Sequence, residues 1–389
     1  MKIFNQVHER RNTRSVKWDM LDAVFQSTEV LPMWVADMDF RAPEEVNEAI
    51  IDRARHGIYG YTVIDNSVKD AITNWHVKRH SWEINKAWLS FSPGVVTSLL
   101  MAIQTFTKPE DKILIQTPVY TPFYSVIEKH DRHVIKNPLV LRNNYYHIDF
   151  HDFEEKLKSG VKAFILCSPH NPVGRVWTKE ELTEMAQLCM KYNVMIFSDE
   201  IHADLINPDE LHIPIASLSD EIADRTITCM APSKTFNLAG LQASYIITSN
   251  KTNRGLLDDN LSKQGHHLLN TMATTALEAA YKHGDKWLDE LRTVLYEHRN
   301  YVTEMLEKHT SLQVIRSEGT YLVWIDCNSL EMDDKALKKF MIEKAKVGLN
   351  TGIEYGEDGS KFMRMNIACP RVILEEGVQR IIDAITNKK

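Results

Sequence analysis

The chain has 389 residues, of which 43% are hydrophobic and 25% charged, and its formal net charge is −7. This composition is typical of a globular protein, and the length predicts one large domain with a smaller one. The acidic balance argues against a nucleic-acid partner, and no apolar run is long enough to span a membrane. Five scattered cysteines indicate a reduced, cytoplasmic protein, and the histidines show no spacing that predicts a metal site.

The middle of the chain alternates apolar, strand-like runs with helical patterns. The predicted strands are 112–116, 163–167, 194–197 and 226–230, followed by a run at 243–248 that is expected to pair beside the fourth. Thr178, with Glu181 three residues later, forms a capping box and predicts the start of a helix. Apolar runs separated by helices predict a mostly parallel sheet that is covered on both faces.

The last third of the chain has a different pattern. Residues 273–309 are helical in periodicity and predict a connector that leaves the large domain. Strands at 319–325 and 362–366 and a final helix at 375–386 predict a smaller α+β unit. The predicted organisation is an N-terminal arm packing on both domains (1–45), a large domain (46–285) and a small domain (286–389).

Polar residues follow four of the predicted strands, at the edge where parallel sheets bind ligands. They are Thr117–Tyr120, Ser168–Pro172, Asp199 and the segment that carries Lys234. A lysine amine forms an imine with an aldehyde, and a nearby carboxylate can keep a ring nitrogen protonated, which suits pyridoxal 5'-phosphate. Gly94 precedes an apolar helical stretch whose first N–H groups can bind a phosphate, although Pro-Gly is also an ordinary turn.

Seven segments in chain order carry a resemblance to a known family: Leu31–Phe40, Tyr59–Thr62, Ser92–Val96, Pro118–Phe123, Ser168–Trp177, Ser198–Asp204 and Ser233–Gln242. On these segments the chain resembles fold-type I pyridoxal-phosphate enzymes of the aspartate aminotransferase superfamily. More narrowly, it resembles the bacterial cystathionine β-lyase, or C–S lyase, group. The resemblance implies an α/β fold with a large domain built on a mostly parallel sheet and a smaller α+β domain.

The resemblance also implies roles for individual residues. Lys234 would carry the cofactor and move the substrate's α-proton, and Asp199 would pair with the ring nitrogen. The remaining cofactor contacts would come from Gly94, Val95, Val96, Tyr120, Asn171, His202, Ser233 and Tyr61. Tyr61 would reach the phosphate of the neighbouring subunit, which requires a homodimer. Arg364 would bind the substrate carboxylate, and the substrate pocket would be lined by Trp34, Val35, Tyr61 and Tyr321.

Several of these residues also have a purely structural interpretation. Asp199 suits a helix N-cap, Asn171 precedes proline in a common turn, and Tyr120 suits a core aromatic. His202 could be a satisfied structural histidine, and a lone arginine such as Arg364 usually faces solvent. These alternatives stay open at the level of the sequence.

The sequence departs from many aminotransferases near the lysine, where Ala231 and Gln242 replace a serine and an arginine that bind the phosphate. This departure favours β-elimination of L-cystathionine or related S-conjugates, which yields a thiol, pyruvate and ammonia. Lys234 or Tyr120 would supply a proton to the leaving sulfur. The alternatives are an aminotransferase and a lyase with an added regulatory binding role. A nicotinamide-dependent enzyme is disfavoured because its glycine-rich turn is missing.

Overall fold

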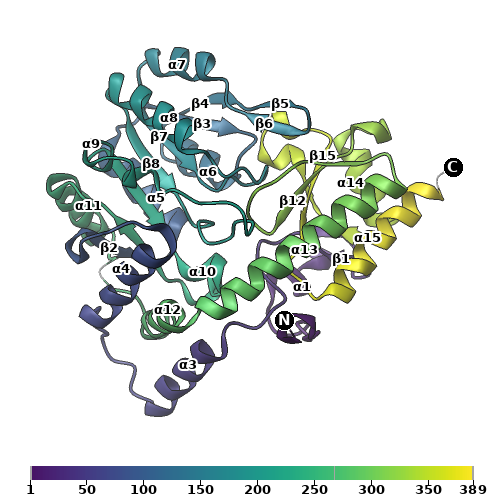
Figure 1. Cartoon of the computed structure of the whole chain (residues 1–389), viewed down its shortest axis with the longest axis horizontal. Helices are drawn as coiled ribbons and strands as arrows, with labels where there is room; N and C mark the ends of the chain where they lie inside the picture. Colours follow the sequence, from purple (N-terminus) through teal and green to yellow (C-terminus); the bar gives the residue numbers. More distant parts are fainter. Residues whose placement is uncertain (1, 267, 388–389) are drawn as a thin grey trace.

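The computed structural model describes residues 2–266 and 268–387 and shows a large and a small sheet linked by a long helix (Figure 1). The large sheet has seven strands in the order β2-β10-β9-β8-β7-β3-β4. They are β2 (Leu89–Ser92), β3 (Lys112–Thr117), β4 (His133–Pro138), β7 (Val161–Cys167), β8 (Met195–Asp199), β9 (Thr226–Met230) and β10 (Ser244–Ile247). Six of these strands run in one direction and β10 alone runs in the other, so the predicted mostly parallel sheet is confirmed.

Both faces of this sheet are buried, which explains its nearly continuous apolar strands. Ile113 and Ile115 face one side, whereas Leu114 between them faces the other. The first side is covered by α5 (Val95–Phe106), α6 (Pro122–Glu128) and α11 (Lys251–Lys263). The second is covered by α7 (Phe150–Lys158) and α8 (Lys179–Lys191), and α8 begins with the predicted capping box of Thr178 and Glu181.

The helical pattern over 273–309 forms two helices instead of one. They are α12 (Thr271–His283) and α13 (Asp285–His309), and they meet at Gly284. A Cβ at position 284 would lie 2.3 Å from the ring of Phe236, so only glycine fits this close approach. The remaining helices of residues 44–283 are α3 (Glu44–His56), α4 (Asn66–His80), α9 (Asp220–Ala223) and α10 (Pro232–Thr235).

The small sheet is antiparallel, with the strand order β11-β12-β15-β14. Its strands are β11 (Gln313–Val314), β12 (Leu322–Asp326), β14 (Asn350–Thr351) and β15 (Phe362–Asn366), and α13, α14 (Asp334–Glu343) and α15 (Arg371–Thr386) pack on it. The strand predicted from residue 319 begins only at Leu322, because Thr320 has φ of 66° and leaves the extended conformation. A separate hairpin joins β5 (Val140–Arg142) to β6 (Tyr145–His147).

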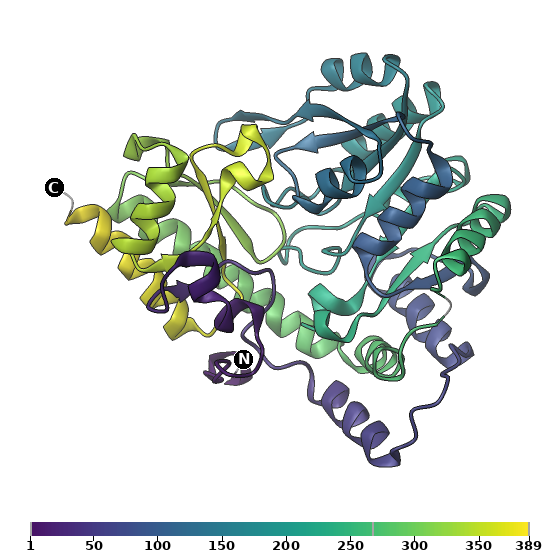
Figure 2. The ribbon, with the colours of Figure 1, turned by 180° about the vertical axis from the view of Figure 1, so that it is seen from behind.

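The N-terminal segment lies against the small sheet before it continues into α3 (Figure 2). Its elements are η1 (Lys2–Asn5), α1 (Val16–Asp19), α2 (Leu21–Phe25) and β1 (Leu31–Pro32), and β1 pairs with β13 (Val347–Gly348). Asn237, beside the predicted lysine, binds the N–H and carbonyl of Met38. The segment thus contacts both halves, while the boundaries at 45 and 285 stay predictions.

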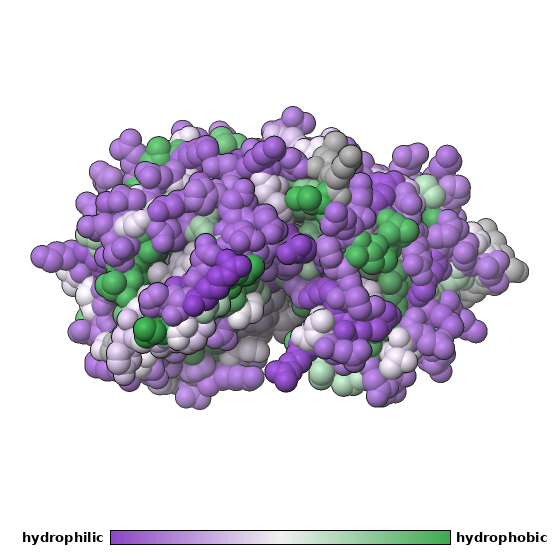
Figure 3. Space-filling view, turned by 90° about the horizontal axis from the view of Figure 1, so that it is seen from below, coloured by the Kyte–Doolittle hydropathy of each residue, from purple (hydrophilic) through white to green (hydrophobic). Residues whose placement is uncertain are grey.

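Short 3-10 helices complete the chain: η2 (Lys86–Trp88), η3 (Ile215–Ser217), η4 (Ala239–Leu241), η5 (Asn328–Leu330), η6 (Gly352–Tyr355) and η7 (Glu357–Gly359). Seen from below, hydrophilic side chains cover most of the surface and hydrophobic ones form small separate patches (Figure 3). None of the described helices combines the length and apolar character that crossing a bilayer requires.

Candidate active site

Most of the predicted site residues meet in a cavity of about 210 Å³ at the carboxyl end of the large sheet. Strands β7, β8 and β9 lead into it, beside the first turns of α5 and α10. Nine predicted residues line the cavity: Gly94, Val95, Val96, Tyr120, Asn171, Asp199, His202, Ser233 and Lys234. The fold thus brings these distant segments together where parallel sheets bind ligands.

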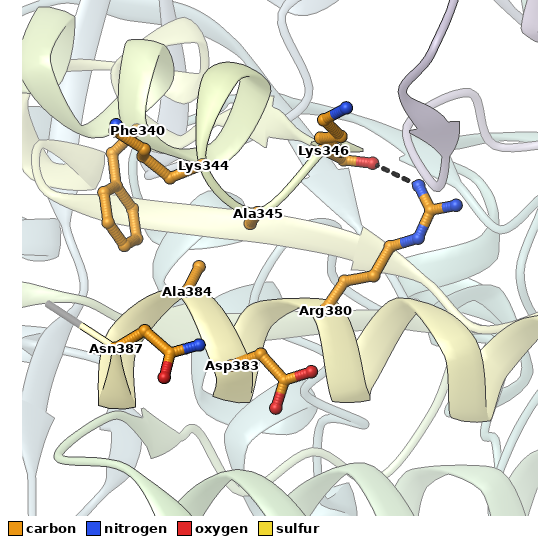
Figure 4. Close-up of a pocket in the computed structure, with 8 residues that line it drawn as sticks. All are labelled: Phe340, Lys344, Ala345, Lys346, Arg380, Asp383, Ala384 and Asn387. Carbon is orange, nitrogen blue, oxygen red and sulfur yellow. Dashed lines mark hydrogen bonds between the residues drawn. The ribbon is translucent and has the colours of Figure 1, made fainter.

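A larger surface hollow of about 730 Å³ lies between α14 and α15 (Figure 4). Arg380 points across it and donates a hydrogen bond to the carbonyl of Lys346 at 2.9 Å. None of the predicted site residues lines this hollow, whereas nine of them line the smaller cavity.

Lys234 is held in the short helix α10, shortly after strand β9 ends. Its Nζ donates a hydrogen bond to the backbone carbonyl of Ala36 at 2.6 Å. Burial, together with the positive charge of Arg364, lowers the pKa of the Lys234 amine to about 8. A fraction of this amine is therefore unprotonated near neutral pH and can act as a nucleophile or a base.

Asp199 is the last residue of β8, and its carboxylate is buried. Among the described residues, only the N–H of Ile201 donates a hydrogen bond to this carboxylate, at 3.1 Å. Burial raises the pKa of Asp199 to about 7, although the Ile201 N–H and the charge of Lys234 oppose the shift. A buried acid with so few donors suits a cationic N–H partner.

Neutral side chains form much of the remaining wall. His202 is buried, and its Nδ1 has no hydrogen-bond partner within 2–266 and 268–387. Burial, aided by the charges of Lys234 and Arg364, lowers the pKa of His202 to about 3, so the ring is uncharged. The N–H of Tyr120 donates to the carbonyl of Asn171 at 3.1 Å, which fixes two strand-end loops against each other.

Arg364, on strand β15 of the small sheet, does not line the cavity itself but contacts Asn171, which does. Its guanidinium donates to Asn171 Oδ1 at 3.2 Å, to the carbonyl of Trp34 at 2.8 Å and to Asn350 Oδ1 at 2.7 Å. The side chain is buried, and its Nε has no partner in the described part of the chain. Arg364 therefore bridges both sheets and the N-terminal segment, and it does not face solvent as a lone strand arginine usually would.

Residues 34–37 contribute to the site through their backbone. The carbonyl of Ala36 accepts hydrogen bonds from Lys234 and from the hydroxyl of Tyr321, the latter at 2.8 Å. The ring of Trp34 packs against Phe25, and its indole N–H donates to Lys17. Trp34, Val35 and Tyr321 do not line the cavity itself, so their role toward a substrate stays a prediction.

Tyr61 is not brought to the cavity of its own chain. It is fully exposed in the loop between α3 and α4, where Ile58, Tyr59 and Val63 are exposed as well. Contact with the site of a neighbouring subunit stays a prediction.

The cavity also contains residues that had no assigned role or an ambiguous one. Ala36 contributes a backbone carbonyl, which no side-chain pattern can indicate. Thr97 lines the cavity, whereas Ser98 points away and lies 2.7 Å from the hydroxyl of Ser92. Helical spacing would have shown that these two neighbours face different directions. Gln242 also lines the cavity, at the position where many aminotransferases have arginine.

Residues 28–381 match the family of class I and II aminotransferases. The chain belongs to this family. This aminotransferase-family chain is 46% identical to "Cystathionine beta-lyase PatB" of Bacillus subtilis (strain 168), over 98% of this chain and 100% of that one. It is 34% identical to "Protein MalY" of Escherichia coli (strain K12), over 98% of each chain.

Solved structures give the same grouping. Cystalysin from Treponema denticola, which contains pyridoxal 5'-phosphate, matches with a TM-score of 0.96 and 37% identity over 99% of each chain. A pyridoxal-phosphate-bound C–S lyase from Staphylococcus hominis matches with a TM-score of 0.92 and 33% identity over 98% of each. The fold is therefore that of fold-type I pyridoxal-phosphate enzymes.

The cavity fits that cofactor group by group. The Lys234 amine suits its aldehyde, and the poorly partnered Asp199 carboxylate suits its ring nitrogen. Helix α5 leaves the N–H groups of residues 95–97 without partners inside the helix, which suits a phosphate. A Cβ built at Gly94 would meet no atom within 4 Å, so the space before this helix is open.

Proposed function

We propose that this protein is a pyridoxal 5'-phosphate-dependent carbon–sulfur lyase that cleaves the Cβ–S bond of L-cystathionine or a related cysteine S-conjugate. Water is consumed, and the products are a thiol (homocysteine from cystathionine), pyruvate and ammonia. The proposal rests on the half-buried amine of Lys234 and the buried acid of Asp199 in one cavity. Relatives named cystathionine beta-lyase support this reaction.

Each cofactor group has a proposed holder. Lys234 binds the aldehyde, Asp199 the ring nitrogen and Asn171 the phenolic oxygen. Tyr120 and His202 lie against the ring. The phosphate occupies the open space at Gly94. It is held there by the N–H groups of Val95, Val96 and Thr97, by Ser233 and by Tyr61 of the partner subunit. Gln242 lines the same cavity without adding charge, so the helix N-terminus carries most of the attraction.

The cofactor, when bound, stores the electron pair that the substrate's α-carbon retains after losing its proton. Lys234 takes that proton, because its lowered pKa of about 8 leaves part of the amine unprotonated. Arg364 binds the substrate carboxylate with its planar fork in place of some of its present acceptors, Trp34 and Asn350. Lys234 or Tyr120 then delivers a proton to the sulfur as the Cβ–S bond breaks.

The proposed assembly is a homodimer in which each site is completed by the partner subunit's Tyr61. The exposed apolar side chains around Tyr61 are suited to burial by a second copy. A mixture of the Tyr61→Ala and Lys234→Ala proteins tests this idea. After random exchange of subunits, half of the dimers are mixed and each has one intact site, so activity should return to about a quarter of the wild-type value. Activity no higher than the sum of the two variants would contradict the shared site.

An aminotransferase is the main alternative, because it needs the same groups up to loss of the α-proton. The deciding experiment incubates the holoenzyme with cystathionine and no added keto acid. A lyase releases pyruvate and thiol over many turnovers, whereas an aminotransferase stops after one turnover until a keto acid is supplied. A chain with only a regulatory binding role would release neither product.

A cytoplasmic location is part of the proposal. All five cysteines are buried and unpaired, which fits a reducing compartment.

A further inference from the structure

A buried polar cluster lies directly behind the cavity wall formed by residues 199–202. It contains two carboxylates that face away from the cavity, Glu200 and Asp204, each in contact with a histidine ring. Glu200 Oε2 lies 2.8 Å from His212 Nε2, and Asp204 Oδ1 lies 3.1 Å from His80 Nε2. The two rings meet edge to face, with centroids 5.4 Å apart. All four side chains are less than a tenth exposed.

The cluster is joined to both proposed cofactor residues. The Thr235 hydroxyl donates to Asp204 Oδ2 at 2.8 Å, and Thr235 directly follows Lys234 in α10. Glu200 directly follows Asp199, and its Oε1 accepts hydrogen bonds from the Ser198 hydroxyl and the Ile215 N–H. The lysine-bearing turn and the acid-bearing strand end are therefore tied to one set of charged groups.

Helix α4 provides the fixed side of the cluster. His80 is its last residue, and Trp75, five residues earlier, donates its indole N–H to Asp204 Oδ1 at 3.1 Å. Burial alone would raise the pKa of Asp204, but its contacts with His80, Thr235 and Trp75 keep the pKa below its ordinary value. Asp204 is thus a buried, fully partnered carboxylate, an arrangement that usually contributes little net stability.

We infer that Asp204 and Thr235 are positioning residues that set the direction from which the Lys234 amine enters the cavity. The inference rests on Lys234 being the residue that binds the cofactor. Asp204 acts through the Thr235 hydroxyl, and His80 and Trp75 hold the carboxylate on the helix behind. Because Thr235 is the neighbour of Lys234, a small rotation of α10 moves the amine relative to Asp199.

The test compares three holoenzymes: Thr235→Val, Thr235→Ser and Thr226→Val. Valine removes the hydroxyl, whereas serine keeps it. Thr226 is the matched control because it is as buried as Thr235, donates one hydrogen bond, to Ile222, and lies at the opposite end of β9. Three readouts report on the bound cofactor: its circular dichroism, the pH midpoint of its visible absorbance and its dissociation constant. The melting temperature of each protein is measured as well, to detect a purely structural effect.

For Thr235→Val we expect an altered dichroism signal, a shifted pH midpoint and about a tenfold weaker cofactor affinity. A tenfold loss is near the lower end of what a hydrogen bond to a charged group contributes. Thr235→Ser should restore all three, and Thr226→Val should change only the melting temperature. Equal behaviour of the two valine variants would overturn the inference. If Thr235→Val does not fold, Asp204→Asn replaces it with the same two outcomes. A wrong assignment of Lys234 would instead appear as an unchanged cofactor spectrum in Lys234→Ala.

Discussion

The two walls of the cavity act through different parts of their residues. The wall at the strand ends of the large sheet presents side chains: Asp199, Lys234 and Asn171. The segment of residues 34–37, which we call the carbonyl wall and which lines the cavity through Ala36, presents its backbone. Each of its four consecutive carbonyls accepts a hydrogen bond from a side chain of Arg364, Asn366, Lys234 or Tyr321.

This difference indicates that one wall carries out the proton transfers and the other positions the side chains that take part. The strand-end wall contains the groups that can exchange protons, and burial shifts their pKa values toward neutrality. The backbone carbonyls of the carbonyl wall do not titrate, but by accepting hydrogen bonds from Arg364 and Lys234 they hold these two side chains at fixed positions relative to each other. Substitutions in the first wall should therefore abolish the reaction, whereas loss of a donor to the second should weaken it by degrees.

The largest effect is expected from Lys234→Ala. Without the amine, no side chain at that position can take the α-proton, so pyruvate release should fall by at least about a thousandfold. Lys162→Ala, which removes an exposed lysine of β7, is the control and should keep full activity. Near-native pyruvate release by Lys234→Ala would show that the strand-end wall does not contain the base.

Arg364→Lys should have the next largest effect. Lysine keeps the positive charge but loses the planar fork that reaches Asn171, Trp34 and Asn350 together. We expect kcat/KM to fall by about tenfold to a hundredfold, mainly through a higher KM for the substrate carboxylate. The measurement is a steady-state series with cystathionine, and an unchanged KM would remove Arg364 from carboxylate binding.

The sequence predicts the strand-end wall far better than the carbonyl wall, for a physical reason. Parallel strands align their carboxyl ends, so Asp199 and Lys234 could be placed together from apolar runs alone. Backbone carbonyls leave no trace in side-chain type, so the role of Ala36 could not be anticipated. The resemblance marked residues 31–40 as important and assigned Trp34 to the substrate pocket; its ring packs against Phe25, and that assignment stays a prediction.

Some elements of the fold could likewise be predicted from the sequence, and others could not. The central strands were recognisable because both of their faces are buried, as for β7 and β8. Strand β4 was missed because most of its side chains are exposed or half-buried at the sheet edge, which leaves no apolar run. The need for glycine at position 284 follows from the close approach of Phe236, which lies far away in the sequence. Helical periodicity alone cannot reveal such a contact.

The pH dependence of Lys234 tests the link between the two walls. In the cofactor-free protein, reaction of this amine with an amine-selective reagent should have a midpoint near pH 8, below that of exposed lysines. Arg364→Gln should move the midpoint upward, because it removes a positive charge that disfavours the protonated amine. Arg371→Gln, on α15, is the control and should leave the midpoint unchanged. A midpoint insensitive to Arg364 would mean that burial alone sets the pKa.

The smallest effect is expected from Tyr321→Phe, which probes the carbonyl wall by itself. The substitution removes one of the two donors to the carbonyl of Ala36 and leaves Lys234 as the other. The lost hydrogen bond joins neutral groups, so we expect kcat/KM to fall only about threefold, with the pH profile shifted little.

Tyr146→Phe is the matched control, because Tyr146 is also buried and its hydroxyl accepts one hydrogen bond, from Trp324, outside the cavity. It should lower the melting temperature without changing kcat/KM. A loss of more than about a hundredfold in Tyr321→Phe would exceed what one neutral hydrogen bond contributes and would contradict a purely positioning role. The Tyr321 hydroxyl would then act on the substrate directly, and the carbonyl wall would share in the chemistry that we assign to the strand ends.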